Sequence, residues 1–445
     1  MSRVAVLGGG LAGIRAALDA ADAGHAVTLL ERAPRLGGLA GSFERAGRGV
    51  DTGQHVFLRC CTAYRALLDR LAVTDATVLQ DRLDVTVLRP GRAPARLRRT
   101  GAPAPLHLAA SLLRYDPVPR RARVALGRAA LALRAVDPAD PAADRETFGA
   151  WLRRHGQGAV AVRGVWDLIG LPTLNLPADE ASLALAAVVF RVGLLGAADA
   201  ADLGWARVPL GELHDVAARR ALTGAGVTVA TGTRVVAVHR DLRVTTTGRD
   251  GRRDTLAADA VVCALPPEIA AAVLPAPLAT RLAVDAAALG TSPIVDVHLR
   301  YDRTVLDVPF AAGLDTPVQW VFDRTREGDT GQYLVVSLSA ANAYLARPSR
   351  DLVATFTAAL ASLLPRARAA RVLDAFVTRA PRATFRPVPG TAAHRPAAAT
   401  PLPGLALAGA WTDTGWPATM EGAVRSGSTA AALVAAPRAA DRVAA

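Results

Sequence analysis

The feature that most constrains the fold is the stretch VAVLGGGLAG at residues 4–13, where an apolar run leads directly into glycines. The apolar residues 3–7 predict a short buried strand, and the Ala-rich segment that ends at Gly24 predicts a helix. A second apolar run, at 26–31, ends in Glu31 and predicts the next strand. Two strands that are joined by a helix pair in parallel, with a right-handed crossover. We therefore expect an α/β fold with a Rossmann-type domain.

The glycines at positions 8, 10 and 13 match the spacing G-x-G-x-x-G of a dinucleotide site. The first permits a tight turn, the second lets a pyrophosphate approach the backbone, and the third lets the helix pack closely on the strand. The helix N-terminus adds free N–H groups and the positive end of its dipole. Glu31 lies 18 residues beyond Gly13, where an acid favours a ribose with a free 2′-hydroxyl. The residues expected at the phosphates are Gly8, Gly10, Leu11, Ala12 and Gly13.

Composition limits the class of protein. The chain has 445 residues, which suits two domains, and 51% of them are hydrophobic, enough for a sizeable core. The formal net charge is +13 and every basic side chain is arginine, which is typical of a GC-rich genome; an Arg-rich face for phosphates or an anionic membrane is the alternative. No basic helix or aromatic-interleaved basic strip is present, so no nucleic-acid partner is expected. Three cysteines without a C-x-x-C pair indicate no disulfide framework and no metal site, and they suit a reducing cytoplasm.

The character of the sequence changes along the chain. Residues 71–205 are rich in Arg, Ala and Leu at helical spacing and predict a mostly helical insertion, and the α/β pattern returns at 208–240. Strands of a second sheet are expected at 291–300, 318–322 and 332–339, and a helix at 351–378. We therefore predict two discontinuous domains. The nucleotide-binding domain would comprise 1–70, 206–290 and 386–445, and an α+β substrate domain would comprise 71–205 and 291–385.

Three further segments bear on location. The most apolar stretch, 181–198, carries Arg191 at its centre, which argues against a transmembrane span and for a buried or interfacial helix. The densest basic run, 90–101, is expected to form a solvated hairpin or loop, with a membrane-facing loop as the alternative. No signal peptide precedes the first strand, and residues 436–445 are expected to fray. These features together predict a cytoplasmic protein.

Two segments beyond the glycine loop point to a family. ERAPRLGG at 31–38 places a glycine pair after the acid, and GAWTDTGWPATMEGAVRSG at 409–427 forms the last strand–loop–helix. Together they resemble the flavin-dependent amine oxidase and phytoene desaturase superfamily over essentially the whole chain. The resemblance implies non-covalent FAD in a GR2-like fold, with the last helix, opened by Thr419 and Met420, pointing at the flavin. The further cofactor-binding residues that it implies are Arg32, Gly37, Gly38, Leu39, Gly53, Gln54, Val235 and Gly409.

Finer stretches at 51–71, 166–190 and 408–427 look like the hydroxysqualene dehydroxylase family of bacterial hopanoid pathways. That resemblance implies the loss of the hydroxyl from a hydrophobic C30 isoprenoid, with hydride supplied by reduced flavin and squalene as the product. Such a reaction needs an acid, a long apolar tunnel and a dry site. It also implies a peripheral contact with the inner face of the membrane. The electron donor to FAD is left open.

Candidates for the acid are few. Asp51 and His55 lie in VDTGQHV, a segment that runs beside the flavin in this superfamily, and Asp413 lies in the loop before the last helix. His55 is as well explained as a packed core histidine, and Asp413 as a ligand of the ribityl chain.

Two departures from the family pattern stand out. Leu39 occupies the place of an arginine that binds pyrophosphate in many relatives, a role left to Arg32 or Arg35, and Ala410 replaces a common acid. Three other functions remain open. An amine oxidase is disfavoured because the chain has no lysine and only 4% aromatic residues. A carotenoid or squalene desaturase differs mainly in the direction of hydride transfer, and a non-catalytic isoprenoid-binding protein would not need intact glycines.

Overall fold

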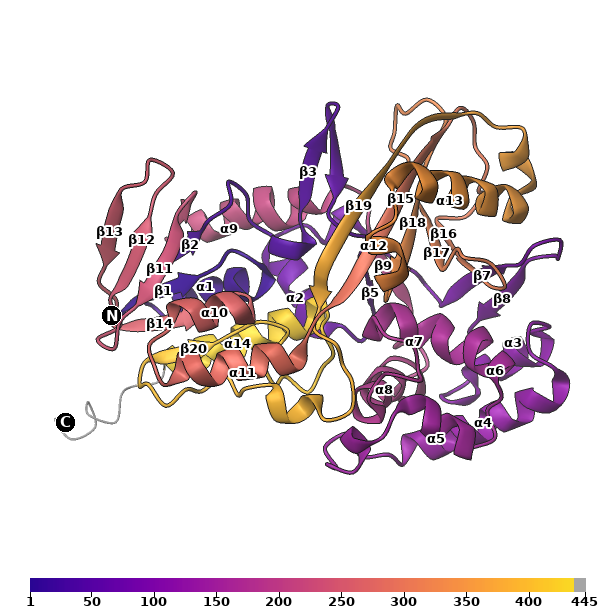
Figure 1. Ribbon diagram of the computed structural model, residues 1–445, viewed down its shortest axis with the longest axis horizontal. Helices are drawn as coiled ribbons and strands as arrows, with labels where there is room; N and C mark the ends of the chain where they lie inside the picture. The colour runs from indigo at the N-terminus through magenta and orange to yellow at the C-terminus, as the bar shows by residue number, and fades with distance from the viewer. Residues whose placement is uncertain (436–445) are drawn as a thin grey trace.

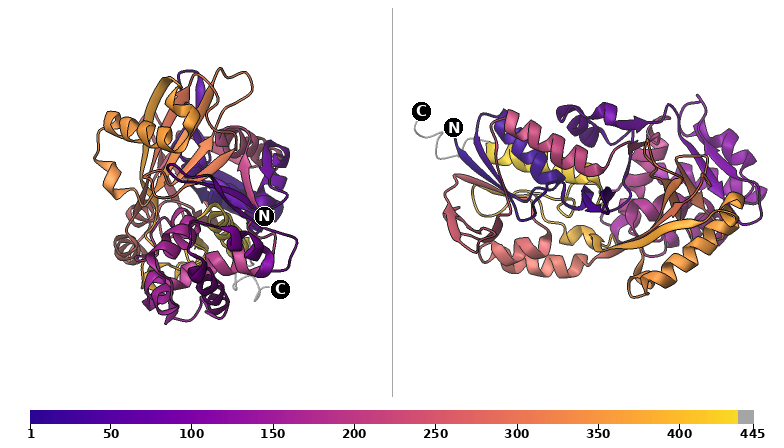
Figure 2. Two further views of the ribbon diagram at one scale, coloured as in Figure 1. Left: turned by 90° about the vertical axis from the view of Figure 1, so that its right-hand side faces the viewer. Right: turned by 90° about the horizontal axis from the view of Figure 1, so that it is seen from above.

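The computed structural model describes residues 1–435, and the predicted frayed end at 436–445 lies outside the described residues. A parallel sheet lies at one end of the long axis, and a larger mixed sheet and a group of helices share the other end (Figures 1 and 2). The predicted α/β class with a second sheet is confirmed.

The parallel sheet has five strands in the order β10–β2–β1–β14–β20. Residues of β1 alternate: Val4 and Val6 join the buried cluster of the helices α1 and α14, whereas Ala5 and Leu7 face the opposite side. The order brings together segments from three distant parts of the chain, as the returning α/β pattern predicted. The bounds are β1 (Arg3–Leu7), α1 (Leu11–Asp22), β2 (Ala26–Glu31), β10 (Thr228–Thr231), β14 (Ala260–Cys263), β20 (Leu405–Leu407) and α14 (Met420–Ala435).

Shorter elements fill the intervals between these strands. They include two small antiparallel sheets, one of β11, β12 and β13 and one that joins β5 and β6 to β9. Their bounds are β3 (Ser42–Arg45), β4 (Arg48–Asp51), β5 (Val56–Leu58), α2 (Thr62–Arg70), β6 (Thr77–Leu79), β9 (Leu203–Ala206), η7 (Glu212–Ala217), α9 (Ala218–Gly224), β11 (Arg234–Val238), β12 (Val244–Thr247), β13 (Arg253–Leu256), α10 (Pro267–Val273) and α11 (Leu278–Leu289).

The mixed sheet has seven strands in the order β19–β15–β18–β17–β16–β7–β8. One face packs on helix α13: Val295, Val297 and Leu299 of β15 share a buried cluster with Phe356 and Leu360. The opposite face packs toward the helical region. The bounds are β7 (Asp84–Leu88), β8 (Ala95–Arg98), β15 (Ser292–Tyr301), β16 (Phe310–Gly313), β17 (Trp320–Asp323), β18 (Gln332–Ser339), α12 (Asn342–Leu345), α13 (Ser349–Leu363) and β19 (Val372–Thr384).

The helical region lies below the mixed sheet in Figure 1. Helix α8 is buried along its whole length, so the prediction of a buried helix in 181–198 is confirmed. Arg191 at its end donates a hydrogen bond to the carbonyl oxygen of Val136. The bounds are α3 (Ala109–Arg114), α4 (Arg120–Arg134), α5 (Phe148–Arg154), α6 (Ala159–Ala161), η5 (Val162–Trp166), α7 (Asp167–Leu174), α8 (Leu183–Phe190) and η6 (Arg191–Gly196).

One prediction of secondary structure was wrong in part. The helix expected over 351–378 ends at Leu363, and β19 begins at Val372, because residues 372–384 pair along β15 at the sheet edge. The insertion at 71–205 is mostly helical, as predicted, but it also contains β7 and β8. These two strands form the hairpin predicted for the basic run, and that hairpin extends the mixed sheet. Among residues 1–435, no helix is both long and apolar enough to cross a bilayer.

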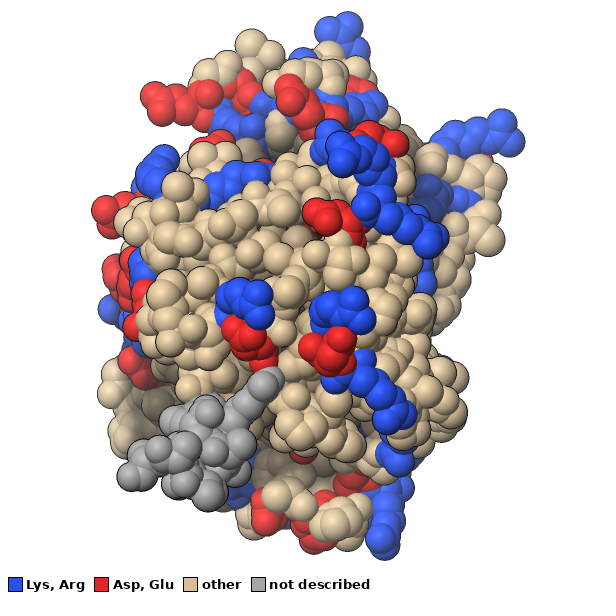
Figure 3. Space-filling view, turned by 90° about the vertical axis from the view of Figure 1, so that its left-hand side faces the viewer, with Lys and Arg blue, Asp and Glu red and all other residues tan. Residues whose placement is uncertain are grey.

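Surface charge is interspersed on the face that Figure 3 shows, at the end of the parallel sheet: basic and acidic side chains lie near one another between wide uncharged areas. Pairs such as Arg3 with Asp259 (2.8 Å) and Arg70 with Asp22 (2.8 Å) place opposite charges side by side at the surface. Exposed pairs of this kind contribute little to stability.

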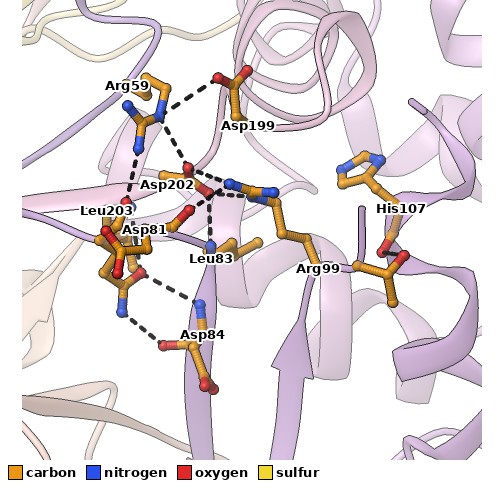
Figure 4. Close-up of polar contacts among 11 residues, drawn as sticks. Arg59, Asp81, Leu83, Asp84, Arg99, His107, Asp199, Asp202 and Leu203 are labelled. Carbon is orange, nitrogen blue, oxygen red and sulfur yellow. Dashed lines mark hydrogen bonds and ion pairs between the residues drawn. The ribbon is translucent and has the colours of Figure 1, made fainter. Parts of the chain in front are cut away.

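A buried ion-pair network joins three strands to the loop before β9 (Figure 4). The carboxylate of Asp202, which is inaccessible to solvent, accepts hydrogen bonds from Nε of Arg59 (2.9 Å), from Nε of Arg99 (2.6 Å) and from the N–H of Leu83 (2.6 Å). Burial alone would raise the pKa of Asp202, but the hydrogen bonds from Arg99 and Arg59 outweigh it and the pKa is lowered. Asp199 also faces Arg59, at 3.7 Å, but is exposed.

We expect Asp202→Asn to lower the free energy of unfolding by about 3–5 kcal/mol, because two guanidinium groups lose a buried counter-charge. The matched variant Asp199→Asn should cost less than about 1 kcal/mol. Urea unfolding at neutral pH measures both. Since the folded pKa of Asp202 is depressed, the difference between wild type and Asp202→Asn should shrink as the pH falls below about 4. Equal losses in the two variants would contradict the assignment.

Candidate functional site

The glycine turn after β1 is built so closely that two of its positions accept no side chain. Gly8 has a φ of +102°, and a Cβ on Gly13 would lie 1.8 Å from the carbonyl oxygen of Gly8. Gly10 differs from both: it has ordinary extended backbone angles, and a Cβ there would meet nothing within 4 Å. The turn therefore leaves open space beside Gly10, at the N-terminus of α1, where no side chain caps the helix.

Glu31 ends β2 beside this turn. Its carboxylate accepts hydrogen bonds from the N–H of Gly9 (2.7 Å) and from the N–H of Ala33 (2.7 Å). The predicted acid therefore lies at the carboxyl edge of the sheet, next to the turn, and ties that turn to the following loop. Arg32 in that loop is exposed.

The second glycine pair packs against the first turn. Gly37 and Gly38 have φ values of +93° and +57°, and the N–H of Gly37 donates to the carbonyl oxygen of Gly9 (2.8 Å). A Cβ on Gly38 would lie 3.1 Å from Cα of Gly10. The structure thus brings the two glycine motifs together at one site. Leu39 is 63% exposed.

His214 supports this arrangement and was missed from the sequence. Its Nδ1 donates to the carbonyl oxygen of Ala40 (2.6 Å), and its Nε2 accepts from the hydroxyl of Tyr64 (2.9 Å). A Cβ on Gly37 would lie 3.1 Å from Cβ of His214. Burial lowers the pKa of His214 to about 4, so the ring is neutral. The only sequence signal was a lone histidine in a helical segment, which fits a core residue equally well.

Asp51 and His55 lie close together, at the junction with the mixed sheet. The buried carboxylate of Asp51 accepts hydrogen bonds from the Ser42 hydroxyl (2.7 Å) and the Leu210 N–H (2.9 Å), and it pairs with Arg324 (2.6 Å). Nδ1 of His55 donates to the carbonyl oxygen of Gly53 (2.9 Å). Burial lowers the pKa of His55, with Gly53 and Asp51 acting in the opposite direction. The lowered pKa favours the neutral ring of His55. The adjacent Gln54 is half-buried.

The last strand and helix form the opposite side of the site. Gly409 follows β20 with a φ of +134°, and its N–H donates to the Ser426 hydroxyl (2.7 Å). Thr419 precedes α14, which begins at Met420 as predicted. The carboxylate of Glu421 turns away to α2, where it accepts hydrogen bonds from the N–H groups of Ala63 (3.1 Å) and Tyr64 (2.8 Å). The side chain of Glu421 therefore anchors α14 to α2.

Arg395 is a second residue that sequence reasoning missed. Its Nη2 donates to the carbonyl oxygens of Ala410 (3.2 Å) and Thr412 (2.6 Å), so a buried guanidinium orders the loop before α14. Burial lowers the pKa of Arg395 to about 10, although Asp413 acts to raise it. Asp413 itself is exposed, whereas Asp51 is buried and His55 is half-buried.

Among the other predicted residues, Leu11 and Ala12 are buried in the first turn of α1. Val235 lies in β11 at an irregularity in its pairing with β12. Four features fit a dinucleotide cofactor: the open space at Gly10, the uncapped α1, the acid at the end of β2 and the second glycine pair. Among the described residues, no group of three or more His, Cys, Asp or Glu side chains is arranged to hold a metal ion.

Comparisons with known proteins agree with this geometry. The family model described as flavin containing amine oxidoreductase matches residues 11–435. A hydroxysqualene dehydroxylase from Rhodopseudomonas palustris is 29% identical, over 97% of this chain and 98% of the relative. A zeta-carotene desaturase from Zea mays is 24% identical, over 97% of this chain and 83% of the relative. A solved cyclohexylamine oxidase from Brevibacterium oxydans has the same fold, with a TM-score of 0.72 at 19% identity over 98% of each chain. The chain therefore belongs to the flavin-containing amine oxidoreductases and is an FAD-dependent oxidoreductase.

Proposed function

We propose that the protein removes the hydroxyl group of hydroxysqualene reductively to give squalene. The observation that carries this proposal is the match to hydroxysqualene dehydroxylase, which extends over 97% of this chain and 98% of the relative. The mixed sheet and the helical region share one cluster of buried apolar side chains, which would supply the walls of a site for a C30 hydrocarbon. When bound, reduced flavin supplies the hydride.

A carotenoid desaturase is the second candidate, and one observation favours it: several relatives over nearly the whole chain are zeta-carotene or phytoene desaturases, at 24–25% identity. Both activities need a long apolar substrate beside the flavin. They differ in whether the substrate receives hydride or gives it up, so the direction of electron flow separates them.

We propose that FAD lies along the carboxyl edge of the parallel sheet. Gly10 and the N–H groups of α1 would hold the pyrophosphate, and Glu31 would hold the ribose in exchange for its present contact with Gly9. The start of α14 would face the flavin ring. The segments 1–70, 206–290 and 386–445 would form this FAD-binding domain, with 71–205 and 291–385 as the substrate domain.

We also propose that the helical region contacts the membrane. Leu113 in α3 and Val124 and Leu131 in α4 are 71%, 61% and 58% exposed, although they are apolar. Residues 102–136 contain six arginines and a single acid, Asp116, which pairs with Arg89. Exposed apolar side chains flanked by arginine suit the interface of an anionic bilayer, where the side chains enter the acyl region and the guanidinium groups meet phosphates.

The reaction is tested by an anaerobic single turnover. The holoenzyme is photoreduced, hydroxysqualene is added in detergent, and the visible band of oxidised flavin is followed. We expect the band to recover while an equal amount of squalene appears. If the reduced enzyme does not respond, but a polyene precursor bleaches the oxidised enzyme, the activity is that of a desaturase.

The cofactor geometry is tested by Gly10→Ala. Because a methyl group fits beside Gly10 in the protein alone, the apoprotein should keep its melting temperature. The same methyl group would meet the pyrophosphate, so FAD affinity should fall at least about 10-fold, by flavin fluorescence titration. The control is Gly127→Ala on α4, where a Cβ also meets nothing within 4 Å and FAD affinity should not change. Unchanged affinity in Gly10→Ala would place the pyrophosphate elsewhere.

The membrane contact is tested by the double variant Val124→Glu, Leu131→Glu. Burying two such side chains contributes about 3–6 kcal/mol, so binding to phosphatidylglycerol vesicles should weaken by about 100-fold or more in a flotation assay. The control is Val284→Glu on α11, an equally exposed apolar position (57%) outside the helical region. Equal weakening in both variants, or wild type that stays entirely in the soluble fraction, would exclude this surface.

A further inference from the structure

The face of the mixed sheet that points away from α13 carries a buried acid. Strand alternation on β15 directs Val295, Val297 and Leu299 toward α13, and therefore directs Asp296 and His298 to the opposite side. Asp296 is 1% exposed, and its Oδ1 has no hydrogen-bond partner among the described residues. A buried carboxyl oxygen without a partner is costly and calls for an explanation beyond packing.

The same face continues as an aromatic wall. Across the strands, Asp296 pairs with Ser337, and Ser337 pairs with Trp320. The next row places Phe322 beside Phe310. The ring centroids of Trp320 and Phe322 are 6.2 Å apart, and those of Phe310 and Trp320 are 6.1 Å apart. Trp320 and Phe322 are only half-buried, and both pack against the apolar cluster that continues into the helical region.

Asp296 and Asp51 differ in the charged groups that surround them. Burial raises the pKa of Asp296 to about 7; the Ser337 hydroxyl acts to lower it and the charge of Asp51 to raise it. Asp51 is already paired with Arg324, whereas no cation within residues 1–435 pairs with Asp296. His298, the next residue on this face, is held by Tyr333 (2.7 Å) and Thr378 (3.1 Å), and burial lowers its pKa to about 3. Asp51 is ion-paired and therefore suits a fixed anion. Asp296 has no ion-pair partner in the described part of the chain and lies beside an aromatic wall, an environment that suits a proton donor.

We infer that Asp296 is the acid that protonates the departing hydroxyl of the substrate, and that Asp51 is a fixed anion that positions the surrounding chain. This inference rests on the proposed function. The carboxyl proton of Asp296 passes to the hydroxyl oxygen, the C–O bond breaks, and one water molecule leaves an allylic cation. Reduced flavin, when bound, would supply the hydride that neutralises this cation and would be oxidised by two electrons, and Asp296 would recover a proton from water. The faces of Trp320 and Phe322 stabilise the cation until hydride arrives.

The test is Asp296→Asn, which preserves the shape of the side chain and removes the acid. We expect kcat to fall by about 100- to 10,000-fold with KM within about 3-fold. In the wild type, kcat should fall as the pH rises through about 7, the pKa of Asp296, and Asp296→Glu should recover part of the rate. A second measurement does not use the reaction: infrared difference spectra of the apoprotein across this pH range should show a protonated carboxyl band that Asp296→Asn lacks.

The matched control is Asp167→Asn on α7. Burial raises the pKa of Asp167 to about 6, but its carboxylate already accepts a hydrogen bond from the N–H of Ala178 (2.8 Å). This variant should lose an infrared band at lower pH and keep kcat. Wild-type kcat in Asp296→Asn, or an equal loss in both variants, overturns the inference. If the infrared spectra of the wild type show the expected titration of Asp296, but the single turnover yields no squalene, the proposed reaction is overturned instead.

Discussion

The close contact of α1 with backbone on two of its sides is the constraint on which the rest of the structure depends. On one side, Gly13 lies against the carbonyl oxygen of Gly8; on the other, a Cβ on Gly427 of α14 would lie 2.3 Å from the carbonyl oxygen of Ala12. These contacts fix the N-terminus of α1 between β1 and α14. Because both helices begin at the same edge of the parallel sheet, the site is assembled from the first and last elements of the described chain.

Much of this half was predictable from local patterns. The spacing of Gly8, Gly10 and Gly13 and the acid at the end of β2 are short-range features, and their geometry follows from the strand–helix–strand order. The start of α14 at Met420 agrees with what the family resemblance implied rather than with a local spacing. The hydrophobic spacing predicted a helix in the segment that forms β19. That segment is instead an edge strand, because β15 offers unpaired hydrogen-bonding groups.

The residues that sequence reasoning missed share a physical cause. His214 and Asp296 lie beside residues far away in the chain, and Arg395 binds carbonyl groups 15 and 17 residues further on, and no local spacing encodes those contacts. Asp296 interrupts an apolar strand, but only the position of α13 decides which face of the sheet it occupies. Among the predicted acids, the structure separates Asp413, which is exposed, from Asp51 and His55. The local sequence gave no sign that Asp51 would pair with Arg324.

The way the chain is joined across its middle has a kinetic consequence. The small sheet of β5, β9 and β6, the network of Asp202 and the pair of Asp51 with Arg324 all connect elements near the parallel sheet to elements near the mixed sheet. The chain itself also passes several times between the two regions. A hinge motion that moved the parallel sheet away from the mixed sheet would therefore break all of these contacts at once. For the hydrocarbon substrate proposed above, entry would then be end first. Its rate of entry would depend on the length and stiffness of the hydrocarbon, and release of the product by the same path would limit turnover.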